Sequence, residues 1–338
     1  MAQGPLARQT GGRVGGAILL TDVCEARWRE GLGAAAPARP RVVLRGGAVE
    51  GSLDDVEIAY FSGDSLPDRA REFMVAALKS PQLRWLHSSS AGVDHDVFQR
   101  FLARGVRLTT SSGAHAVPIA QTVVLYLLAL SRDLRGWLDA QRERRWAPRP
   151  IHDLAGRRLG VAGLGPIGLE VARLGRALRM HVIGLRRRVR GDEPCETWEL
   201  QRLRELLPSL DHLVLALPLA PETRHLLDAD ALARMKPGAT LVNVGRGALV
   251  DEAALADALR AGRLGGAALD VFEVEPLPRE SPLWDLPNVI VTPHSSGASP
   301  DNDERATAIF LENLRAFEAG GPLRNEVAIS LGRPPGAE

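Results

Sequence analysis

Short apolar runs alternate with longer amphipathic stretches over most of the 338 residues. The runs in the first part that are typical of strands include 41–44, 57–61 and 83–88, and helices are expected over 68–78 and 97–103. A second, denser series starts at Arg158 and continues near positions 181, 213, 240, 267 and 289. Alternation of this kind is typical of parallel sheets covered by helices. The pattern predicts an α/β protein with two parallel-sheet domains, each Rossmann-like or flavodoxin-like, and an interdomain cleft.

The order of these elements predicts that the first domain is discontinuous. Residues 17–113 would form most of it, and 114–298 the second domain. The last helix should open at Ser299–Pro300, because serine is a good N-cap and proline suits the first helical position. Its expected apolar face consists of Ile309, Phe310, Leu314 and Phe317. Since this helix follows the final strand of the second domain, we expect 299–338 to return to the first.

Composition excludes some classes of partner. Formal charges nearly cancel, with 42 basic and 41 acidic residues, so no overall field attracts nucleic acid or a membrane, and we expect neither as a partner. The apolar run 117–130 is interrupted and short for a bilayer, which favours a buried helix. Residues 1–16 lack the apolar core of a signal peptide and are interpreted as a disordered lead-in. Two cysteines without metal-ligand spacing favour a reduced, cytoplasmic setting.

A glycine-rich turn lies directly between a predicted strand and a predicted helix. Its residues are Gly163, Leu164, Gly165, Pro166, Ile167 and Gly168. The first glycine permits a tight turn, the second lets the backbone approach a pyrophosphate, and the third lets helix and strand pack closely. The helix N-terminus adds a positive dipole. The turn therefore predicts a dinucleotide cofactor.

Three arginines follow the next strand. About 20 residues after the glycine turn, an acidic residue would normally bind the ribose hydroxyls of NAD. Arg186, Arg187 and Arg188 stand there instead, and a guanidinium can bind a 2′-phosphate bidentately. We therefore expect NADP(H) to be favoured, with NAD(H) possible. The alternative is a solvated arginine run without a role.

Three further residues each follow a short apolar run, namely Arg246, Glu275 and His294. Ligands bind outside the carboxyl ends of parallel strands, so these side chains should meet in one site. Arg246 could bind a carboxylate, and His294 could donate a proton near neutral pH. Glu275 on one ring nitrogen would fix the tautomer of His294 and leave the other nitrogen for a substrate.

Two other chemistries fit these residues less well. A metal site that also used Asp270 would include an arginine and has no supporting HxxxH or cysteine pair, so we expect no metal. A hydrolytic triad through Ser295 or Ser296 is formally possible, but no nucleophile elbow is present.

Six motifs together resemble the D-isomer-specific 2-hydroxyacid dehydrogenase family over about 58–332. They are SAGVDH at 90–95, GLGPIG at 163–168, PLAPETRHLL at 218–227, MKPGATLVNVGRGALVDEAAL at 235–255, ALDVFEVEPLP at 268–278 and TPHSSG at 292–297. The resemblance implies a substrate-binding (catalytic) first domain and a dinucleotide-binding Rossmann second domain. It also implies that Arg246, Glu275 and His294 are catalytic.

The resemblance extends the predicted site. Substrate would be bound by Ser90, Ala91, Gly92 and Arg246. The residues expected to bind the cofactor, from the two patterns above and from the resemblance, are Gly163, Gly165, Pro166, Ile167, Gly168, Arg186, Arg187, Arg188, Leu217, Pro218, Thr223, Val244, Gly245, Asp270, His294 and Gly297. The sequence departs from the family at Arg186, which is similar to NADP-preferring glyoxylate and hydroxypyruvate reductases. It also departs at 120–123, where AQTV replaces AEHV, and at Ser295, where a larger apolar residue is common.

These observations predict an oxidoreductase that transfers hydride from NADPH to C2 of a small 2-ketoacid and gives a D-2-hydroxy acid. Glyoxylate or hydroxypyruvate is the expected type of substrate. One alternative is an NAD(H)-dependent D-2-hydroxyacid dehydrogenase of other specificity. Another is a catalytically weak nucleotide-sensing interaction protein, as the corepressors of this superfamily are. We also expect a homodimer formed through the helix 116–133 and the arm 137–146.

Overall fold

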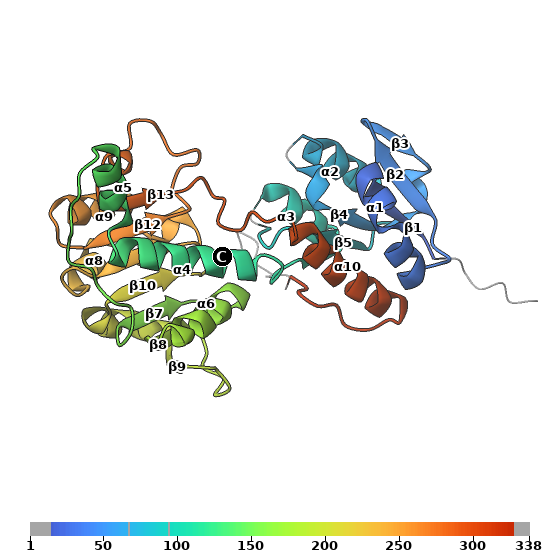
Figure 1. The fold of residues 1–338 in the computed structure, drawn as a ribbon. Coiled ribbons are helices and arrows are strands. Elements are labelled where there is room, and N and C mark those ends of the chain that lie inside the picture. Colours follow the sequence, from blue (N-terminus) through green and yellow to red (C-terminus); the bar gives the residue numbers. More distant parts are fainter. Residues whose placement is uncertain (1–14, 67, 94, 328–338) are drawn as a thin grey trace, which may run out of the picture. The chain divides into compact units, whose positions relative to one another are not determined.

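The computed structural model describes residues 15–66, 68–93 and 95–327 (Figure 1). Of the predicted lead-in over 1–16, all but the last two residues lie outside this range, as do 328–338. The chain divides into two compact units. The first contains 1–114 and 300–338, and the second contains 115–299. Each unit has its own sheet and is described separately below.

The first unit is built on a six-stranded sheet with the order β3-β2-β1-β4-β5-β6. Its strands are β1 (Ala17–Thr21), β2 (Arg41–Arg45), β3 (Ala48–Glu50), β4 (Val56–Phe61), β5 (Trp85–Ser88) and β6 (Arg107–Thr110). All neighbouring pairs are parallel except β2 and β3, which form an antiparallel hairpin at the edge. The carboxyl ends of the parallel strands therefore share one edge.

Four long helices cover the two faces of this sheet. They are α1 (Asp22–Ala35), α2 (Ala70–Lys79), α3 (Asp96–Ala103) and α10 (Asn302–Glu318). Leu19 of β1 packs in the core that contains residues of α2 and α3. Its neighbour Ile18 packs in the core that contains residues of α1 and α10. This alternation is the two-residue period of a strand buried on both faces.

Helix α10 begins two residues later than predicted. Its N-cap is Asp301 rather than Ser299, and Pro300 and Asp301 form a turn before the helix. The Arg305 side chain helps to hold this start, because it donates to the carbonyl of Ala114 and to the side chain of Asn302. The predicted apolar face is correct. Phe310 and Leu314 are buried in one core, and Phe317 packs against it. Ile309 is also buried, in a separate small cluster with Ala114 and Ala306.

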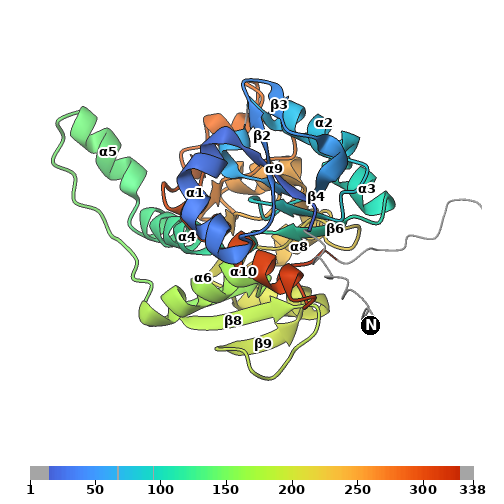
Figure 2. The same cartoon turned by 90° about the vertical axis from the view of Figure 1, so that its right-hand side faces the viewer.

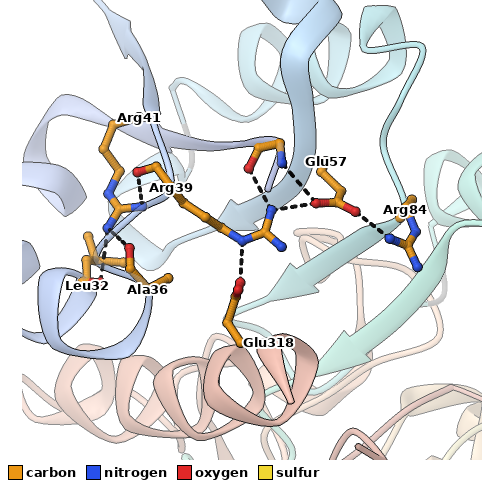
Figure 3. A network of polar contacts seen from close by, with 8 residues as sticks. Leu32, Ala36, Arg39, Arg41, Glu57, Arg84 and Glu318 are labelled. Carbon is orange, nitrogen blue, oxygen red and sulfur yellow. Dashed lines mark hydrogen bonds and ion pairs between the residues drawn. The ribbon is translucent and has the colours of Figure 1, made fainter. Parts of the chain in front are cut away.

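A network of ion pairs joins the end of α10 to the sheet (Figure 3). The Arg39 side chain is only 7% exposed and contacts Glu57 at 2.5 Å and also Glu318 near the end of α10. Arg84 contacts the other Glu57 oxygen, also at 2.5 Å. Burial acts to raise the pKa of Glu57, but hydrogen bonds from Arg39 and Arg84 outweigh it and hold the pKa below its usual value. The Glu57 carboxylate therefore stays charged inside the network.

A buried histidine in the first unit should make stability depend on pH. His87 bonds to Thr109 and Ser111 through its two ring nitrogens, and burial lowers its pKa to about 3. Below its ordinary pKa of about 6.5 the unfolded chain binds a proton that the folded chain does not. We therefore expect the free energy of unfolding to fall as pH drops from about 6.5 towards 4, by up to about 1.4 kcal/mol per pH unit from this residue.

Urea unfolding of the wild type and of His87→Gln at several pH values would test this expectation. The variant should lose less stability between pH values near neutral and near 5. His181→Gln, a change at an exposed histidine, is the matched control and should behave like the wild type. Equal pH dependence in His87→Gln and the wild type would contradict the prediction.

The second unit contains seven parallel strands in the order β13-β12-β11-β10-β7-β8-β9. They are β7 (Arg158–Ala162), β8 (His181–Arg186), β9 (Glu196–Glu199), β10 (His212–Leu215), β11 (Thr240–Asn243), β12 (Gly266–Leu269) and β13 (Val289–Val291). The sequence pattern did not identify β9, a short edge strand without buried residues. The strand order reverses between β7 and β10, the position where open α/β sheets bind ligands.

Helices lie on both faces of this sheet as well. They are α4 (Ala116–Ser131), α6 (Pro166–Ala177), α7 (Leu203–Leu206), α8 (Ala229–Arg234) and α9 (Glu252–Arg260), and a further helix, α5 (Leu134–Arg142), follows α4. Residues of α4 and α6 share one core, and residues of α7, α8 and α9 share the other. The predicted helix over 116–133 ends at Ser131, because Asp133 has a φ of 49° and caps α5 instead.

Helix α4 is apolar but has only 16 residues. Among the described residues no single helix is both long and apolar enough to cross a membrane. Helices α4 and α5 reach the necessary length and composition only together, across a bend of 66°. Seven residues of α4 are buried within the fold.

Candidate active site

The glycine turn lies at the carboxyl end of β7, next to the reversal in strand order. Gly163 has a φ of 102°, a conformation that other residues rarely adopt. A Cβ on Gly168 would come within 1.8 Å of the Gly163 carbonyl oxygen, so only glycine lets α6 approach β7 this closely. Around Gly165, by contrast, a Cβ would meet nothing within 4 Å. The backbone is therefore open where the sequence predicts the pyrophosphate.

Helix α6 completes the fit of this turn to a dinucleotide. Gly165 is its N-cap, without a side-chain capping hydrogen bond, and Pro166 is its first residue. The first turn of a helix has N–H groups without intrahelical acceptors, and its dipole favours an anion. The residues present thus fit the phosphates of a nicotinamide dinucleotide.

The arginine run after β8 divides into differently placed side chains. Arg186 ends the strand and donates to Glu193 at 2.8 Å. Arg187 is 81% exposed and lies 3.9 Å from Glu222, and Arg188 is exposed. The sequence pattern identified the arginines but not the glutamate that holds the first of them.

Glu275 and His294 come together in the second unit. His294 follows β13 with a φ of 50°, and its backbone N–H donates to the Asp270 carbonyl at 2.8 Å. Its Nδ1 lies 2.8 Å from Oε2 of Glu275. The other Glu275 oxygen accepts the Phe272 N–H at 3.0 Å, which fixes the carboxylate. Since Nδ1 is bonded to Glu275, Nε2 is the ring nitrogen that remains for a substrate. The His294 side chain is 52% exposed.

Arg246 stands in a turn that the buried Asn243 shapes. The Asn243 side chain donates to the Arg246 carbonyl at 2.9 Å and accepts the Gly245 N–H at 3.1 Å. A Cβ on Gly247 would come within 2.0 Å of backbone atoms of Phe272. The turn after β11 is therefore packed directly against the loop that fixes Glu275. The sequence pattern did not identify Asn243, although its polar side chain at the end of an apolar strand is a usable signal.

Asp270 is 1% exposed and organises the loop that carries His294. Its carboxylate accepts hydrogen bonds from the Thr292 hydroxyl at 2.6 Å and from the N–H groups of Ser295 and Ser296. Tyr126 of α4 lies 2.5 Å from the same Thr292 hydroxyl. Because Thr292 donates to Asp270, Tyr126 must donate to Thr292. Burial raises the pKa of Tyr126 to about 12, so its hydroxyl keeps the proton at neutral pH.

Tyr126→Phe is therefore expected to disturb the His294 loop through Thr292. Loss of one hydrogen bond should reduce the free energy of unfolding by about 1 kcal/mol and kcat by roughly fivefold. Urea unfolding and steady-state kinetics measure the two effects. Tyr60→Phe in the first unit removes a similar hydroxyl contact, to Thr307 at 2.9 Å, and should cost stability without lowering kcat. An unchanged kcat in Tyr126→Phe would argue against the link.

The other residues predicted to bind the cofactor or the substrate lie in several segments of the two units. Thr223 uses its hydroxyl within the loop after β10, where it donates to Pro218 and accepts from Ala220. Ser90, Ala91 and Gly92 follow β5 in the first unit. The remaining positions, all in the second unit, are Ile167, Leu217, Val244, Gly245 and Gly297. Their cofactor and substrate contacts stay predictions. Across the described parts of 15–327, no cluster of His, Cys, Asp and Glu is arranged to hold a metal ion.

Comparisons with known proteins show the family to which the chain belongs. The family model for the NAD binding domain of D-isomer specific 2-hydroxyacid dehydrogenases matches residues 124–296. A glyoxylate reductase from Korarchaeum cryptofilum is 35% identical over 267 residues, which cover 76% of this chain and 80% of that protein.

Two solved structures are similar over nearly the whole chain. A D-isomer specific 2-hydroxyacid dehydrogenase from Xanthobacter autotrophicus, in complex with NADPH and MES, is 35% identical with a TM-score of 0.78, covering 93% of this chain and 98% of that one. An NADPH-dependent glyoxylate/hydroxypyruvate reductase from Sinorhizobium meliloti, in complex with NADP and sulfate, is 30% identical with a TM-score of 0.75 and the same coverage. The chain therefore belongs to the D-isomer-specific 2-hydroxyacid dehydrogenase family and is an NAD(P)-dependent oxidoreductase.

Proposed function

We propose that the protein is a reductase that uses NADPH to convert a small 2-ketoacid, of the glyoxylate or hydroxypyruvate type, into a D-2-hydroxy acid. The observation that carries this proposal is the pair of His294 and Glu275, whose Nδ1 and Oε2 atoms lie 2.8 Å apart. The pair belongs to the same unit as the glycine turn that is predicted to bind the dinucleotide. This pair is suited to protonating a carbonyl oxygen that gains negative charge. The NADPH and NADP complexes of the two similar structures support the choice of cofactor.

Each residue of the pair has a distinct part in this mechanism. A bound reduced nicotinamide would supply the hydride. Glu275, held by the Phe272 N–H, orients the imidazole through Nδ1. His294 donates the Nε2 proton to the carbonyl oxygen of the substrate, and Glu275 stabilises the ring as its charge changes.

Arg246 acts on the substrate rather than on the proton. Its guanidinium binds the substrate carboxylate and the developing alkoxide, because a planar fork of donors suits both oxygens. Its position after β11 is held by Asn243 and by the contact of Gly247 with the Phe272 backbone.

Cofactor oxidation, followed by the absorbance of reduced nicotinamide, tests the function directly. NADPH and NADH would be compared with glyoxylate, hydroxypyruvate, pyruvate and phenylpyruvate. Turnover with NADPH and one of the first two acids is the expected result. Turnover with NADH alone would keep the dehydrogenase and refute the cofactor proposal. Inactivity with all four acids would refute the substrate class and favour a nucleotide-sensing role.

We also propose that the protein forms a homodimer through α4, α5 and the segment after α5. Large apolar side chains are exposed there, at Leu125, Leu128, Leu134, Trp137, Leu138, Trp146 and Ile151. Trp146 is 95% exposed, and Figure 2 shows α5 extending away from the rest of the second unit. Exposed apolar surface of this extent is typical of a subunit interface.

Light scattering coupled to gel filtration would measure the mass of the assembly. The double variant Trp137→Glu/Trp146→Glu should be a monomer, whereas the wild type should be a dimer. Val75→Glu, a charge introduced at an exposed apolar residue of α2, is the control and should leave the mass unchanged. A dimeric double variant would place the interface elsewhere.

A further inference from the structure

The loop between β8 and β9 places a carboxylate against the first of the three arginines that are predicted to bind the 2′-phosphate of NADP(H). Glu193 lies in this loop, and its side chain is only 4% exposed. Its Oε1 accepts hydrogen bonds of 2.8 Å from the Arg186 guanidinium and from the Arg190 N–H. Its Oε2 accepts the Gly191 N–H, also at 2.8 Å. The carboxylate is therefore part of the folded loop and not a mobile surface group.

The charge of Glu193 persists throughout the working pH range. The Arg190 N–H, the Gly191 N–H and the Arg186 guanidinium together lower its pKa to about 2, against the opposing effect of burial. Glu222 lies near the second arginine, but there both side chains are exposed and 3.9 Å apart. The Arg186–Glu193 pair is thus the shorter and the less exposed of the two ion pairs.

This pair acts differently on the two possible cofactors. A 2′-phosphate carries between one and two negative charges at neutral pH. It would need the donors of Arg186, one of which already serves Glu193, and it would be repelled by the fixed carboxylate. The ribose of NAD(H) has an uncharged 2′-hydroxyl, so neither effect applies to it with comparable strength.

We propose that Glu193 is a specificity-determining residue that limits the preference for 2′-phosphorylated nucleotides and keeps both NADP(H) and NAD(H) within reach of the site. This inference rests on the proposed function, because it assumes that the loop after β8 receives the adenosine ribose. The residue that adjusts the preference between NADP(H) and NAD(H) would then lie outside the arginine run.

Calorimetric titration of the full chain with NADP⁺ and with NAD⁺ tests the proposal without any turnover. In Glu193→Gln the Kd for NADP⁺ should fall about tenfold, the effect of removing one nearby charge that is only partly screened. The Kd for NAD⁺ should change by less than about twofold, because its ribose is neutral. The ratio of the two constants is therefore the decisive quantity.

Two further variants separate the charge from the integrity of the loop. Glu196→Gln removes an exposed carboxylate of β9 that bonds to Trp198 rather than to an arginine, and it should leave the ratio unchanged. Glu193→Gln/Arg186→Met should lose most of the gain in NADP⁺ affinity, since the freed guanidinium is then absent.

The outcomes are distinct. A ratio in Glu193→Gln that is unchanged, or that moves towards NAD⁺, would overturn the inference, including the case in which both constants weaken equally because the loop has loosened. If the wild type binds NADP⁺ and only the ratio fails to respond, the proposed function stands. If the wild type binds NAD⁺ alone, the dehydrogenase stands but the choice of NADPH falls. If the wild type binds neither nucleotide, both proposals fall.

Discussion

Replacing His294 by glutamine is expected to lower kcat for ketoacid reduction by about 10²- to 10⁴-fold, the usual contribution of a general acid. The Kd for the nucleotide should change by less than about twofold, because proton donation contributes to the transition state rather than to binding of the cofactor. Single-turnover kinetics would measure the chemical step, and calorimetry would measure the binding. The size of the effect follows from the position of the ring, whose Nδ1 is held by Glu275 while Nε2 remains for the substrate.

Two companion variants make this result specific. Glu275→Gln keeps the shape of the side chain but loses the charge that orients and stabilises the imidazole, so kcat should again fall strongly. Ser295→Ala changes the next residue while its backbone N–H can still bond to Asp270, and it should remain within about threefold of the wild type. Ketoacid reduction at wild-type rates in both His294→Gln and Glu275→Gln would refute the proposed proton donor.

Arg39→Met is expected to cause the largest loss of stability. Removing one partner of a buried ion pair costs about 3–5 kcal/mol, because the remaining charge stays desolvated. Glu57 would still contact Arg84, so we expect a value near the lower end of this range. The variant would also free Glu318 and thereby weaken the attachment of α10 to the rest of the first unit (Figure 3).

Urea denaturation, followed by tryptophan fluorescence, would measure the free energy of unfolding of this variant. Arg29→Met is the matched control, since Arg29 pairs with Glu25 across one turn of α1 and is 72% exposed. An exposed pair of this kind contributes little to stability, because solvent screens it. If both variants had the same stability, the network around Arg39 would not hold α10 as the structure suggests.

The periodicity of the chain was sufficient to predict the class of fold. Apolar runs of strand length, separated by helical stretches, allow few arrangements other than parallel sheets with helices on both faces. The glycine turn could also be predicted from the sequence. Gly163 and Gly168 are required by steric constraints that depend mainly on residues close in sequence. Element ends were less certain, since the start of α10 and the break at Asp133 depend on side-chain contacts and local turns.

The sequence by itself determined which chemistry the chain carries, namely a dinucleotide turn, an arginine run, and an arginine, an acid and an imidazole after successive strands. Only the tertiary structure decided which side chains bond to one another across the fold. Glu193 on Arg186, Tyr126 on Thr292 and Glu318 on Arg39 are contacts between residues 7, 166 and 279 positions apart. No periodic pattern encodes such pairs, because side chains meet through the packing of whole elements rather than through their spacing in the chain.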